Sequence, residues 1–396
     1  MLAAIYDDPA SATGPGMAGY NRFYHLKKAW PLFPGIVRPI AAAFLGDHYA
    51  RRRARRGRLR AGIDALVGLG FHLWIPRRAA LVQRRFGYDE NWRRRAIAIA
   101  RARFADPNDI ALFRIEQAEQ LDHYIRRFED AAINKRINPL GWTGDCALAD
   151  KRRFAERCRI ACLPHAETVA MVEAGQVHIL ADPADRPLIA KPADGEGGDG
   201  VRMLGSIADA PTLMARLRGI RHPTIVQPLI RVHPELADIA LGALPTVRIV
   251  SILDEAGRPE VVSATFRCAS DPRARVDNMK AGGLIVPVDL TDGRLGLACF
   301  GYGGHDHDIH PATGAPIAGR TLPGWAEAIT LVTGAHCAAF ADYALIGWDV
   351  ALTGQGPVLI EGNGKPGVLM PQRAARRGLG ESCYGALLAH HLATKS

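Results

Sequence analysis

The chain has 396 residues, of which 48% are hydrophobic, and it carries a formal net charge of +10. This length and composition exclude a disordered protein and leave room for two or three domains with their own cores. Its seven Cys include no CxxC pair, so we expect reduced thiols, no disulfide framework and no zinc site.

The excess positive charge lies entirely in the N-terminal third. Residues 1–145 hold 25 Lys and Arg against 14 Asp and Glu, a net of +11, whereas the remainder holds 25 against 26. Within this third, Ile110, Phe113, Leu121 and Ile125 recur at helical steps. The sequence therefore predicts a basic, mostly helical N-terminal domain over residues 1–145.

An arginine-rich run, RRRARRGRLR, precedes the apolar run AGIDALVGLGFHLWI at residues 61–75, which Pro76 follows. Fifteen helical residues span about 22 Å, short of the roughly 30 Å hydrocarbon core, so no membrane crossing is expected. A buried helix flanked by solvated Arg is one interpretation. Peripheral membrane contact through residues 51–78, with Trp74 at the headgroup level, is another. Nucleic acid is not expected, because only charge favours it.

The first residues, MLAAIYDDPASATGPG, lack the basic and apolar regions of a signal peptide. We therefore expect a cytoplasmic protein, with peripheral attachment to the inner face of the membrane as the open alternative.

From about residue 146 the pattern changes to short apolar strands separated by turn signals, which predicts an α+β fold with mostly antiparallel strands. The expected elements are a helix at 148–160, strands in ETVAMV, PLIAKP, VRML and TIVQPLI, a hairpin in PTVRIVSILDEAGRPEVVSATFRC, a second hairpin turning at Asp292-Gly293, and a helix at 323–340.

The stretch IGWDVALTGQGPVLIEGNGKPG, residues 346–367, places polar side chains in apolar strands. Glu361 and Asn363 share one strand face, and the turn TGQG folds the preceding strand back so that Asp349 can lie beside them. Two carboxylates and an amide oxygen are hard ligands that suit Mg²⁺. The alternative is a polar edge hairpin, which the apolar flanks disfavour.

A glycine-rich loop, ADGEGGDG at residues 193–200, follows a short strand that ends with Lys191 and Pro192. Backbone N–H groups of such a loop can close on phosphate oxygens while the Lys supplies charge. The loop is neither a Walker A motif nor a Rossmann fingerprint, because a strand follows it. It therefore predicts a flap over a nucleotide, with a plain surface hairpin as the alternative.

The order of these parts resembles the ATP-grasp superfamily over roughly residues 146–370. Two segments, HPATGAPIAGRTLPGW and IGWDVALTGQGPVLIEGN, look most like its sugar-transfer-associated subgroup. The residues that carry the resemblance are Lys151 in LADKRRFAERC, Lys191 with its glycine loop, the segment IVQPLI, Arg248 in LPTVRIVSI, and Asp349 with Glu361-x-Asn363.

The resemblance implies an ATP-grasp fold, in which two α+β lobes close on a nucleotide: residues 146–225 as the lobe with the flap and 226–396 as the lobe with the metal site. It implies ATP and Mg²⁺ as cofactors and a role for each matched residue. These roles are phosphate binding by Lys151, Lys191, Gly197 and Gly198, adenine contact by Gln227 and Leu229, ribose contact by His233, catalysis by Arg248 and Lys191, and metal binding by Asp349, Glu361 and Asn363.

The expected reaction is that of an ADP-forming ligase, which activates a carboxylate as an acyl phosphate and joins it to an amine or another nucleophile. The subgroup resemblance suggests surface-glycan or exopolysaccharide biosynthesis, with a small-molecule or lipid-linked substrate. A phosphotransferase on the same fold and a non-catalytic nucleotide-binding module are the alternatives. The helical, basic N-terminal third departs from the βαβ-type domain usual in these ligases, so substrate identity does not carry over.

Weaker signals surround these motifs. GGHDHDIHPATG is expected to be a polar loop shaped by His310-Pro311, with a second metal site as the alternative. Arg267, Asn278 and Lys280 are candidate contacts to the acceptor or to phosphates, and Lys365 is a candidate anion contact.

Overall fold

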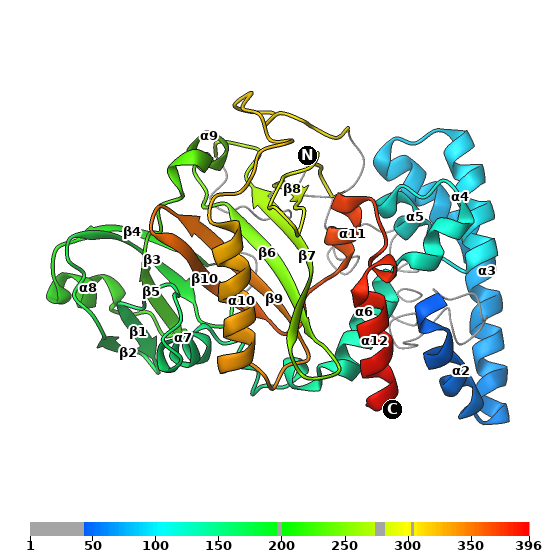
Figure 1. Cartoon of the computed structure of the whole chain (residues 1–396), viewed down its shortest axis with the longest axis horizontal. Helices are drawn as coiled ribbons and strands as arrows, with labels where there is room; N and C mark the ends of the chain where they lie inside the picture. The colour runs from blue at the N-terminus through cyan, green and yellow to red at the C-terminus, as the bar shows by residue number, and fades with distance from the viewer. Residues whose placement is uncertain (1–42, 196–199, 274–281, 302–304, 396) are drawn as a thin grey trace.

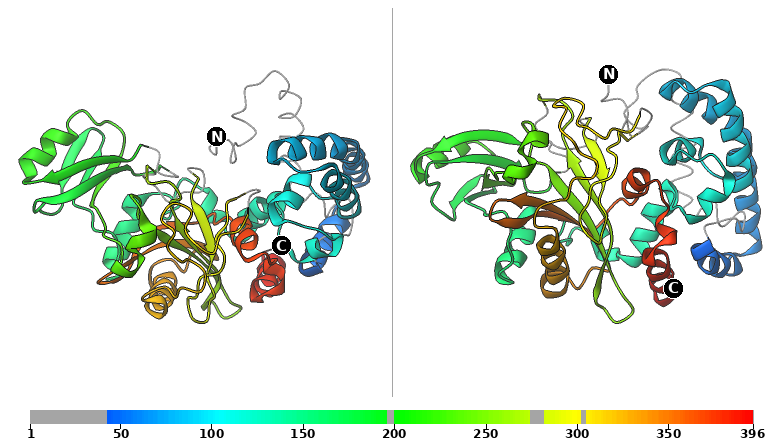
Figure 2. Two further views of the ribbon diagram at one scale, coloured as in Figure 1. Left: turned by 90° about the horizontal axis from the view of Figure 1, so that it is seen from above. Right: turned by 45° about the horizontal axis from the view of Figure 1, so that its top comes forward.

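The computed structural model describes residues 43–195, 200–273, 282–301 and 305–395. Two antiparallel sheets and a helical region follow one another across the molecule, with the smaller lobe and the N-terminal helices at opposite ends (Figures 1 and 2). The predicted α+β class is confirmed.

The described part of the N-terminal third is helical, as predicted. Its long helix α3 packs against α4 and α5. The elements are η2 (Ala43–Leu45), α2 (Gly46–Ala54), α3 (Arg58–Phe86), α4 (Glu90–Arg103), α5 (Pro107–Phe113), η3 (Ala118–His123), α6 (Arg127–Ile137) and η4 (Pro139–Trp142).

Helix α3 continues through Pro76 to Phe86, beyond the apolar run at residues 61–75. A proline inside a helix removes one backbone hydrogen bond and costs about 3 kcal/mol. Buried side chains lie on both sides of it, among them Phe71, Ile75 and Val82. Each contributes about 1.5–3 kcal/mol on burial, so packing outweighs the cost of the proline.

The smaller lobe is a five-stranded antiparallel sheet in the order β2-β1-β5-β3-β4. Helix α8 covers it through Leu213 and Leu217. The predicted strands on either side of the glycine-rich segment are confirmed as β3 and β4, and residues 196–199 between them lie outside the described residues. The elements of this lobe are α7 (Lys151–Ile160), β1 (Ala170–Glu173), β2 (Gln176–Ile179), β3 (Arg186–Pro192), β4 (Arg202–Ile207), α8 (Ala210–Leu217) and β5 (Thr224–Pro228).

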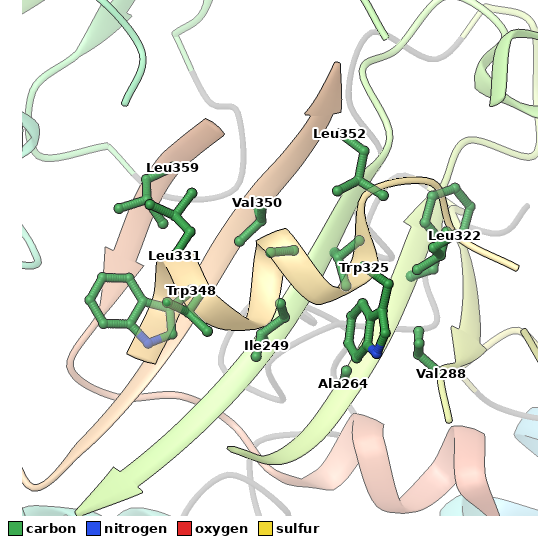
Figure 3. Packing of buried hydrophobic residues seen from close by; sticks show 14 of the residues in the cluster. Ile249, Ala264, Val288, Leu322, Trp325, Leu331, Trp348, Val350, Leu352 and Leu359 are labelled. Atoms are coloured by element: carbon green, nitrogen blue, oxygen red, sulfur yellow. The ribbon is translucent and has the colours of Figure 1, made fainter. Parts of the chain in front are cut away.

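The larger lobe is a second antiparallel sheet in the order β10-β9-β6-β7-β8. Helix α10 covers one face, where its Trp325 and Leu331 pack with Ile249, Trp348 and Val350 of the sheet (Figure 3). The elements are η5 (Pro234–Leu236), α9 (Ala237–Ala240), β6 (Thr246–Leu253), β7 (Pro259–Cys268), β8 (Leu284–Pro287), α10 (Trp325–Ala339), β9 (Leu345–Thr353), β10 (Gly356–Asn363), α11 (Leu369–Ala375), η7 (Leu379–Glu381) and α12 (Cys383–Thr394).

Both predicted hairpins of the larger lobe are present. Strands β6 and β7 pair in full, whereas the second hairpin adds only bridges such as Val288↔Leu295 beyond β8. The helix expected from residue 148 begins at Lys151, because the side chain of Asp150 accepts a hydrogen bond from the backbone N–H of Arg152 at 2.9 Å and caps it.

A shared core joins the N-terminal helices to the second sheet across the predicted domain boundary at residue 145. Tyr49 and Ile133 belong to one buried cluster with Val250 and Leu345. Asn138 adds polar contacts: its Nδ2 donates to Leu345 O at 2.9 Å and to Gly364 O at 2.6 Å, and its Oδ1 accepts from Ala344 N at 3.0 Å. The helices therefore hold the strand ends that carry the candidate site.

Candidate functional site

Asp349 and Glu361 lie directly opposite each other on β9 and β10, as the hairpin prediction required. The turn residues Thr353 and Gly356 pair, and the register runs evenly back to Leu359↔Val350, where a bulge inserts one extra residue. Without this bulge Ile360 would face Asp349, and Glu361 would point to the other side of the sheet, because side chains alternate along a strand. The bulge therefore brings the two carboxyl groups together.

Asp349 is 4% exposed and is held by two arginines. Arg248, its neighbour on β6, donates from Nε to Oδ1 and from Nη2 to Oδ2, the latter at 3.0 Å. Arg267 of β7 places its Nη2 2.8 Å from Oδ1 and also donates to Thr246 Oγ1 at 2.7 Å. Two guanidinium groups thus neutralise one buried carboxylate.

The surroundings shift the pKa values of the two carboxyl groups in opposite directions. Burial acts to raise the pKa of Asp349, but Arg248 and Arg267 outweigh it and hold that pKa well below its usual range. Burial raises the pKa of Glu361, and the charge of Asp349 raises it further, only partly opposed by Lys151. Because the two side chains interact, Glu361 is the weaker acid of the pair and Asp349 the stronger one.

Lys151 connects these carboxyl groups to the start of the glycine-rich loop. Its backbone N–H donates to Ala193 O at 2.9 Å. Its Nζ donates to Gly195 O at 2.6 Å and lies 3.8 Å from Glu361 Oε2. The flap and the acidic pair are therefore within the reach of one lysine.

Lys191 approaches the same place from β3. Its Nζ donates to Gln227 Oε1 at 3.2 Å. Burial lowers the pKa of Lys191, the charge of Glu361 opposes this shift, and Lys151 adds to it. The sequence expectation that two lysines, the glycine loop and the acids converge is met by the described residues.

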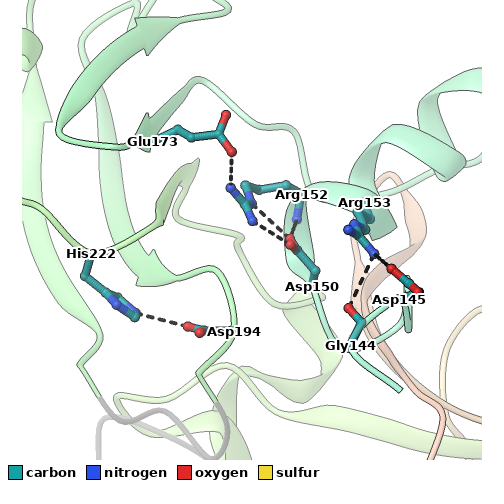
Figure 4. A network of polar contacts seen from close by, with 8 residues as sticks. All are labelled: Gly144, Asp145, Asp150, Arg152, Arg153, Glu173, Asp194 and His222. Carbon is teal, nitrogen blue, oxygen red and sulfur yellow. Dashed lines mark hydrogen bonds and ion pairs between the residues drawn. The ribbon is translucent and has the colours of Figure 1, made fainter. Parts of the chain in front are cut away.

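Polar contacts fix the segments that carry these lysines (Figure 4). Arg152 pairs with Asp150 and with Glu173 of β1, each at 2.6 Å, and so ties the start of α7 to the smaller sheet. His222 Nε2 lies 3.0 Å from Asp194, the residue before Gly195. The sequence reading did not identify this network, because its members come from four separate segments.

The donor chemistry at Asp349, Glu361 and Asn363 fits Mg²⁺. The residues supply two carboxylates and an amide, and Asn363 Nδ2 is buried with no hydrogen-bond partner among the described residues. The third oxygen donor on these strands is the amide of Asn363, and within the described ranges no three His, Cys, Asp or Glu side chains gather as metal ligands. A cation here would also reduce the repulsion between the two acids.

Three residues are expected to contact the nucleoside: Gln227, Leu229 and His233. Gln227 lies beside Lys191, whereas the backbone N–H groups of Leu229 and His233 are used in other hydrogen bonds. Gln227 is buried beside Lys191, and its Nε2 donates to Ala166 O at 3.2 Å. The backbone N–H of Leu229 donates to Pro187 O at 2.8 Å and is therefore already used. His233 lies against the end of β9, where its N–H donates to Leu352 O at 2.8 Å. Their roles toward adenine and ribose stay predictions.

Several predicted residues lie elsewhere or outside the described residues. Gly197, Gly198, Asn278 and Lys280 fall in segments that the structure does not describe. His310 is buried, and its Nδ1 accepts hydrogen bonds from the backbone N–H groups of Ala312 and Thr313 at 3.2 and 3.3 Å, which matches the expected turn. Its Nε2 hydrogen-bonds to the distant Ala269 O at 2.7 Å. The Nζ of Lys365 lies 4.7 Å from the centre of the Trp142 ring.

Residues 207–384 match the family model described as sugar-transfer associated ATP-grasp. No curated protein sequence matches the chain.

Solved structures resemble the chain at low identity. They include an L-amino acid ligase from Bacillus licheniformis (14% identity, 62% of this chain and 48% of that one, TM-score 0.35). A D-alanine–D-alanine ligase from Bacillus anthracis (14%, 63% and 68%, 0.35) and a RimK domain ATP-grasp protein from Sphaerobacter thermophilus (15%, 63% and 67%, 0.31) also match. The chain spans about half the length of the first of these. With its two antiparallel sheets and the family match that contains Arg248, Asp349, Glu361 and Asn363, the chain has the ATP-grasp fold and carries a sugar-transfer associated ATP-grasp region at residues 207–384.

Proposed function

We propose that this protein is an ATP-dependent, ADP-forming ligase that activates a carboxylate as an acyl phosphate and transfers the acyl group to an amine or another nucleophile. The observation that carries this proposal is the convergence of Lys151, Lys191 and the Asp349–Glu361 pair at the base of the glycine-rich loop. Phosphoryl transfer needs positioning and charge neutralisation more than covalent help, and these groups supply both.

The lysines are proposed to bind the phosphates of ATP. Lys191 is a partly exposed cation whose Nζ donates to the neutral Gln227, and an entering phosphate would give it an anionic partner. Lys151 would exchange its contact with Gly195 O for a phosphate oxygen. Charge-assisted hydrogen bonds of this kind contribute about 1.5–3 kcal/mol each.

Asp349, Glu361 and Asn363 are proposed to hold Mg²⁺, which would neutralise phosphate charge when it is bound. Arg248 and Arg267 balance Asp349 in the ligand-free protein. Once a cation shares this carboxylate, the guanidinium groups can turn part of their hydrogen bonding toward a phosphoryl group. Arg248 would then stabilise the charge on the γ-phosphate and on the acyl phosphate, and the flap would exclude water from that intermediate.

Gln227, Leu229 and His233 are proposed to contact the nucleoside through the segment after β5. The side-chain bonds of Gln227 to Lys191 and Ala166 fix its position, so its role would be to shape the base pocket.

We propose surface-glycan or exopolysaccharide assembly as the biological setting and the cytoplasm as the location. The family description supports the first. No helix among the described residues is long and apolar enough to cross a membrane.

The test measures ADP and phosphate release with a panel of carboxylates and amines, followed by mass spectrometry of the product. A ligase gives free phosphate and an amide or ester, whereas a phosphotransferase gives a stable phosphoester. Asp349→Asn and Lys191→Met should lower turnover at least 100-fold, while the exposed Asp145→Asn and Lys135→Met leave it unchanged. Magnesium-dependent nucleotide hydrolysis that survives Asp349→Asn at wild-type rate would contradict the proposed site.

A further inference from the structure

We propose that the end of the molecule formed by α2 and α3 docks on an anionic membrane surface, with an arginine pocket for lipid phosphates and an exposed leucine stripe for the acyl region. This inference is independent of the ATP chemistry, because none of its residues belongs to the site described above.

The arginine pocket is a cavity of about 220 Å³ lined by His48, Arg51, Arg52, Arg55, Arg56 and Arg136. No carboxylate among the described residues lines it. Of the five arginines, only Arg56 has a carboxylate partner among the described residues, Asp64 at 2.8 Å. Burial lowers the pKa of Arg52, and the neighbouring charges of Arg136, Arg56 and Arg55 lower it further. A concentration of like charge that is not balanced from within favours a bound anion.

His48 supplies a second, independent sign of a ligand. The side chain is 97% buried within the pocket, since 3% of it is exposed. Its Nε2 has no hydrogen-bond partner among the residues that the structure describes. A buried polar atom without a partner costs free energy unless a ligand or water satisfies it. A phosphate oxygen in the pocket would provide that partner.

The leucine stripe runs along the outer face of α3 and consists of Leu59, Ile63, Leu66, Leu69 and Leu73. Leu59, Leu66 and Leu73 are 82%, 70% and 71% exposed, and they recur every seven residues. From Leu59 to Leu73 the helix rises about 21 Å. The opposite face of α3 is buried against α4 and α5, so the stripe has no role in the core. An exposed apolar row of this length marks an interaction surface.

The charge around the leucine stripe indicates which kind of partner would bind there. Arginines lie at both ends of the stripe: residues 51–60 at the N-terminal end of α3, and the exposed Arg77 and Arg84 beyond Leu73. A second copy of the chain packed on this face would bring positive ends together in either orientation, which disfavours a homodimer. A nucleic acid would satisfy the arginines but leave the leucines in water, since they offer no aromatic platform for bases. Anionic lipid satisfies both groups.

The position of α3 is compatible with docking. The helix forms the outer edge of the molecule, at the end opposite the smaller lobe (Figures 1 and 2). Trp74, expected at the headgroup level, instead lies against the core beside Phe71 at 5.5 Å and under Arg78. The stripe itself would therefore make the apolar contact, with α3 lying along the surface.

The experiment is vesicle flotation of the full chain at 0.1 M salt. Vesicles of phosphatidylcholine alone are compared with vesicles containing 30% phosphatidylglycerol. We expect binding to the anionic vesicles that is at least tenfold stronger than to the neutral ones. Leu66→Glu with Leu73→Glu, and separately Arg52→Glu with Arg55→Glu, should each reduce it at least tenfold. Met214→Glu, at an exposed position of α8, is the matched control and should leave it unchanged. Because all these positions are exposed or line an open pocket, circular dichroism should show every variant folded.

Other outcomes would overturn the proposal. These are no binding of the wild-type chain to anionic vesicles, or binding that the leucine and arginine variants retain. If the chain binds inorganic phosphate or a DNA oligonucleotide but not vesicles, the ligand of the arginine pocket is an anion other than a lipid phosphate. If sedimentation shows a dimer and Leu66→Glu dissociates it, the leucine stripe is an interface with a second copy of the chain. Turnover of the arginine and leucine variants in detergent solution should equal that of the wild type, which separates this test from that of the ligase proposal.

Discussion

Asp349 and Glu361 face each other across the β9–β10 pair, yet only one of them is balanced by arginines. Arg248 and Arg267 both reach Asp349, whereas the nearest cation to Glu361 is Lys151, 3.8 Å away. Asp349 is therefore the stronger acid of the pair and Glu361 the weaker one. A cation that binds between them would share Asp349 with the arginines.

This asymmetry predicts different stability losses for two similar substitutions. Asp349→Asn removes the partner of two poorly exposed guanidinium groups and should cost about 3 kcal/mol of unfolding free energy. Glu361→Gln removes a desolvated acid next to another acid and should cost less than about 1 kcal/mol. Urea denaturation at pH 7.5 measures both. Equal losses would mean that the arginines do not depend on Asp349.

The lysines should affect nucleotide binding and not stability. Lys191→Met removes a partly exposed cation that donates to the neutral Gln227, so the protein without nucleotide should lose less than about 1 kcal/mol. The Kd for ATP with magnesium should rise roughly 10–100-fold, as expected for one charge-assisted phosphate contact. Isothermal titration calorimetry measures the change. The exposed Lys135→Met is the control, and a similar rise there would point to a general charge effect.

Asp130 should make stability depend on pH. Burial raises the pKa of Asp130 to about 7 in the folded chain, above its ordinary value of 3.8. Its contribution is then fully present below about pH 4 and is lost as the pH rises through 7, because the unfolded chain releases the proton first. Asp130→Asn should therefore gain stability relative to wild type between pH 5 and pH 8, by about 2 kcal/mol after allowance for partial exposure.

The measurement for Asp130→Asn is the difference in unfolding free energy between variant and wild type across this range. Histidines with lowered pKa, such as His48 and His336, also titrate in this region, but they are common to both proteins and cancel. A difference that stays constant with pH would show that Asp130 is ionised in the fold.

Ser251 should stabilise the core through hydrogen bonds. Trp348 Nε1 donates to Ser251 Oγ at 2.8 Å, and that hydroxyl lies 2.8 Å from His336 Nδ1. Ser251→Ala leaves both groups buried without this partner and should cost about 2 kcal/mol. Ser263 of β7 is the matched control, since its buried Oγ has no partner among the described residues. In thermal unfolding, the Tm of Ser251→Ala should lie well below that of Ser263→Ala, which should stay near the wild-type value.

Asn138 should connect the helical region to the candidate site. Asn138→Ala removes three hydrogen bonds to Ala344, Leu345 and Gly364, and it leaves those buried backbone groups unsatisfied. We expect a loss of about 3 kcal/mol in unfolding free energy and a raised KM for ATP, because Gly364 follows the metal-site residue Asn363. Asn91→Ala on the exposed face of α4 serves as the control and should change neither quantity.

The close approach of the helices to this loop also depends on Gly141. A Cβ added there would lie 2.6 Å from Gly364 O, so no side chain can be accommodated without a shift of the backbone. Nothing in the residues around Gly141 indicates this contact, because its partner lies more than two hundred residues further along the chain.

The sequence by itself determined the local elements and the order of the chemical groups. Apolar residues indicated strands at β9 and β10, and the turn residues joined them. The apolar setting also indicated burial of the acids, which holds for Asp349, whereas Glu361 is partly exposed. These features depend on neighbouring residues and so can be read locally. The continuation of α3 past Pro76 cannot be read locally, because it depends on packing against α4 and α5.

Only the tertiary structure decided which partners the groups meet. The bulge before Glu361 sets the face on which that side chain lies, and the arginines of β6 and β7 reach Asp349 across strands about 100 and 80 residues away in sequence. Likewise, the arginine run gave the basic charge, but the fold placed it with Arg136 around His48 and left the leucines of α3 outside the core. Contacts between distant segments depend on how whole elements pack, and no periodicity along one segment encodes that choice.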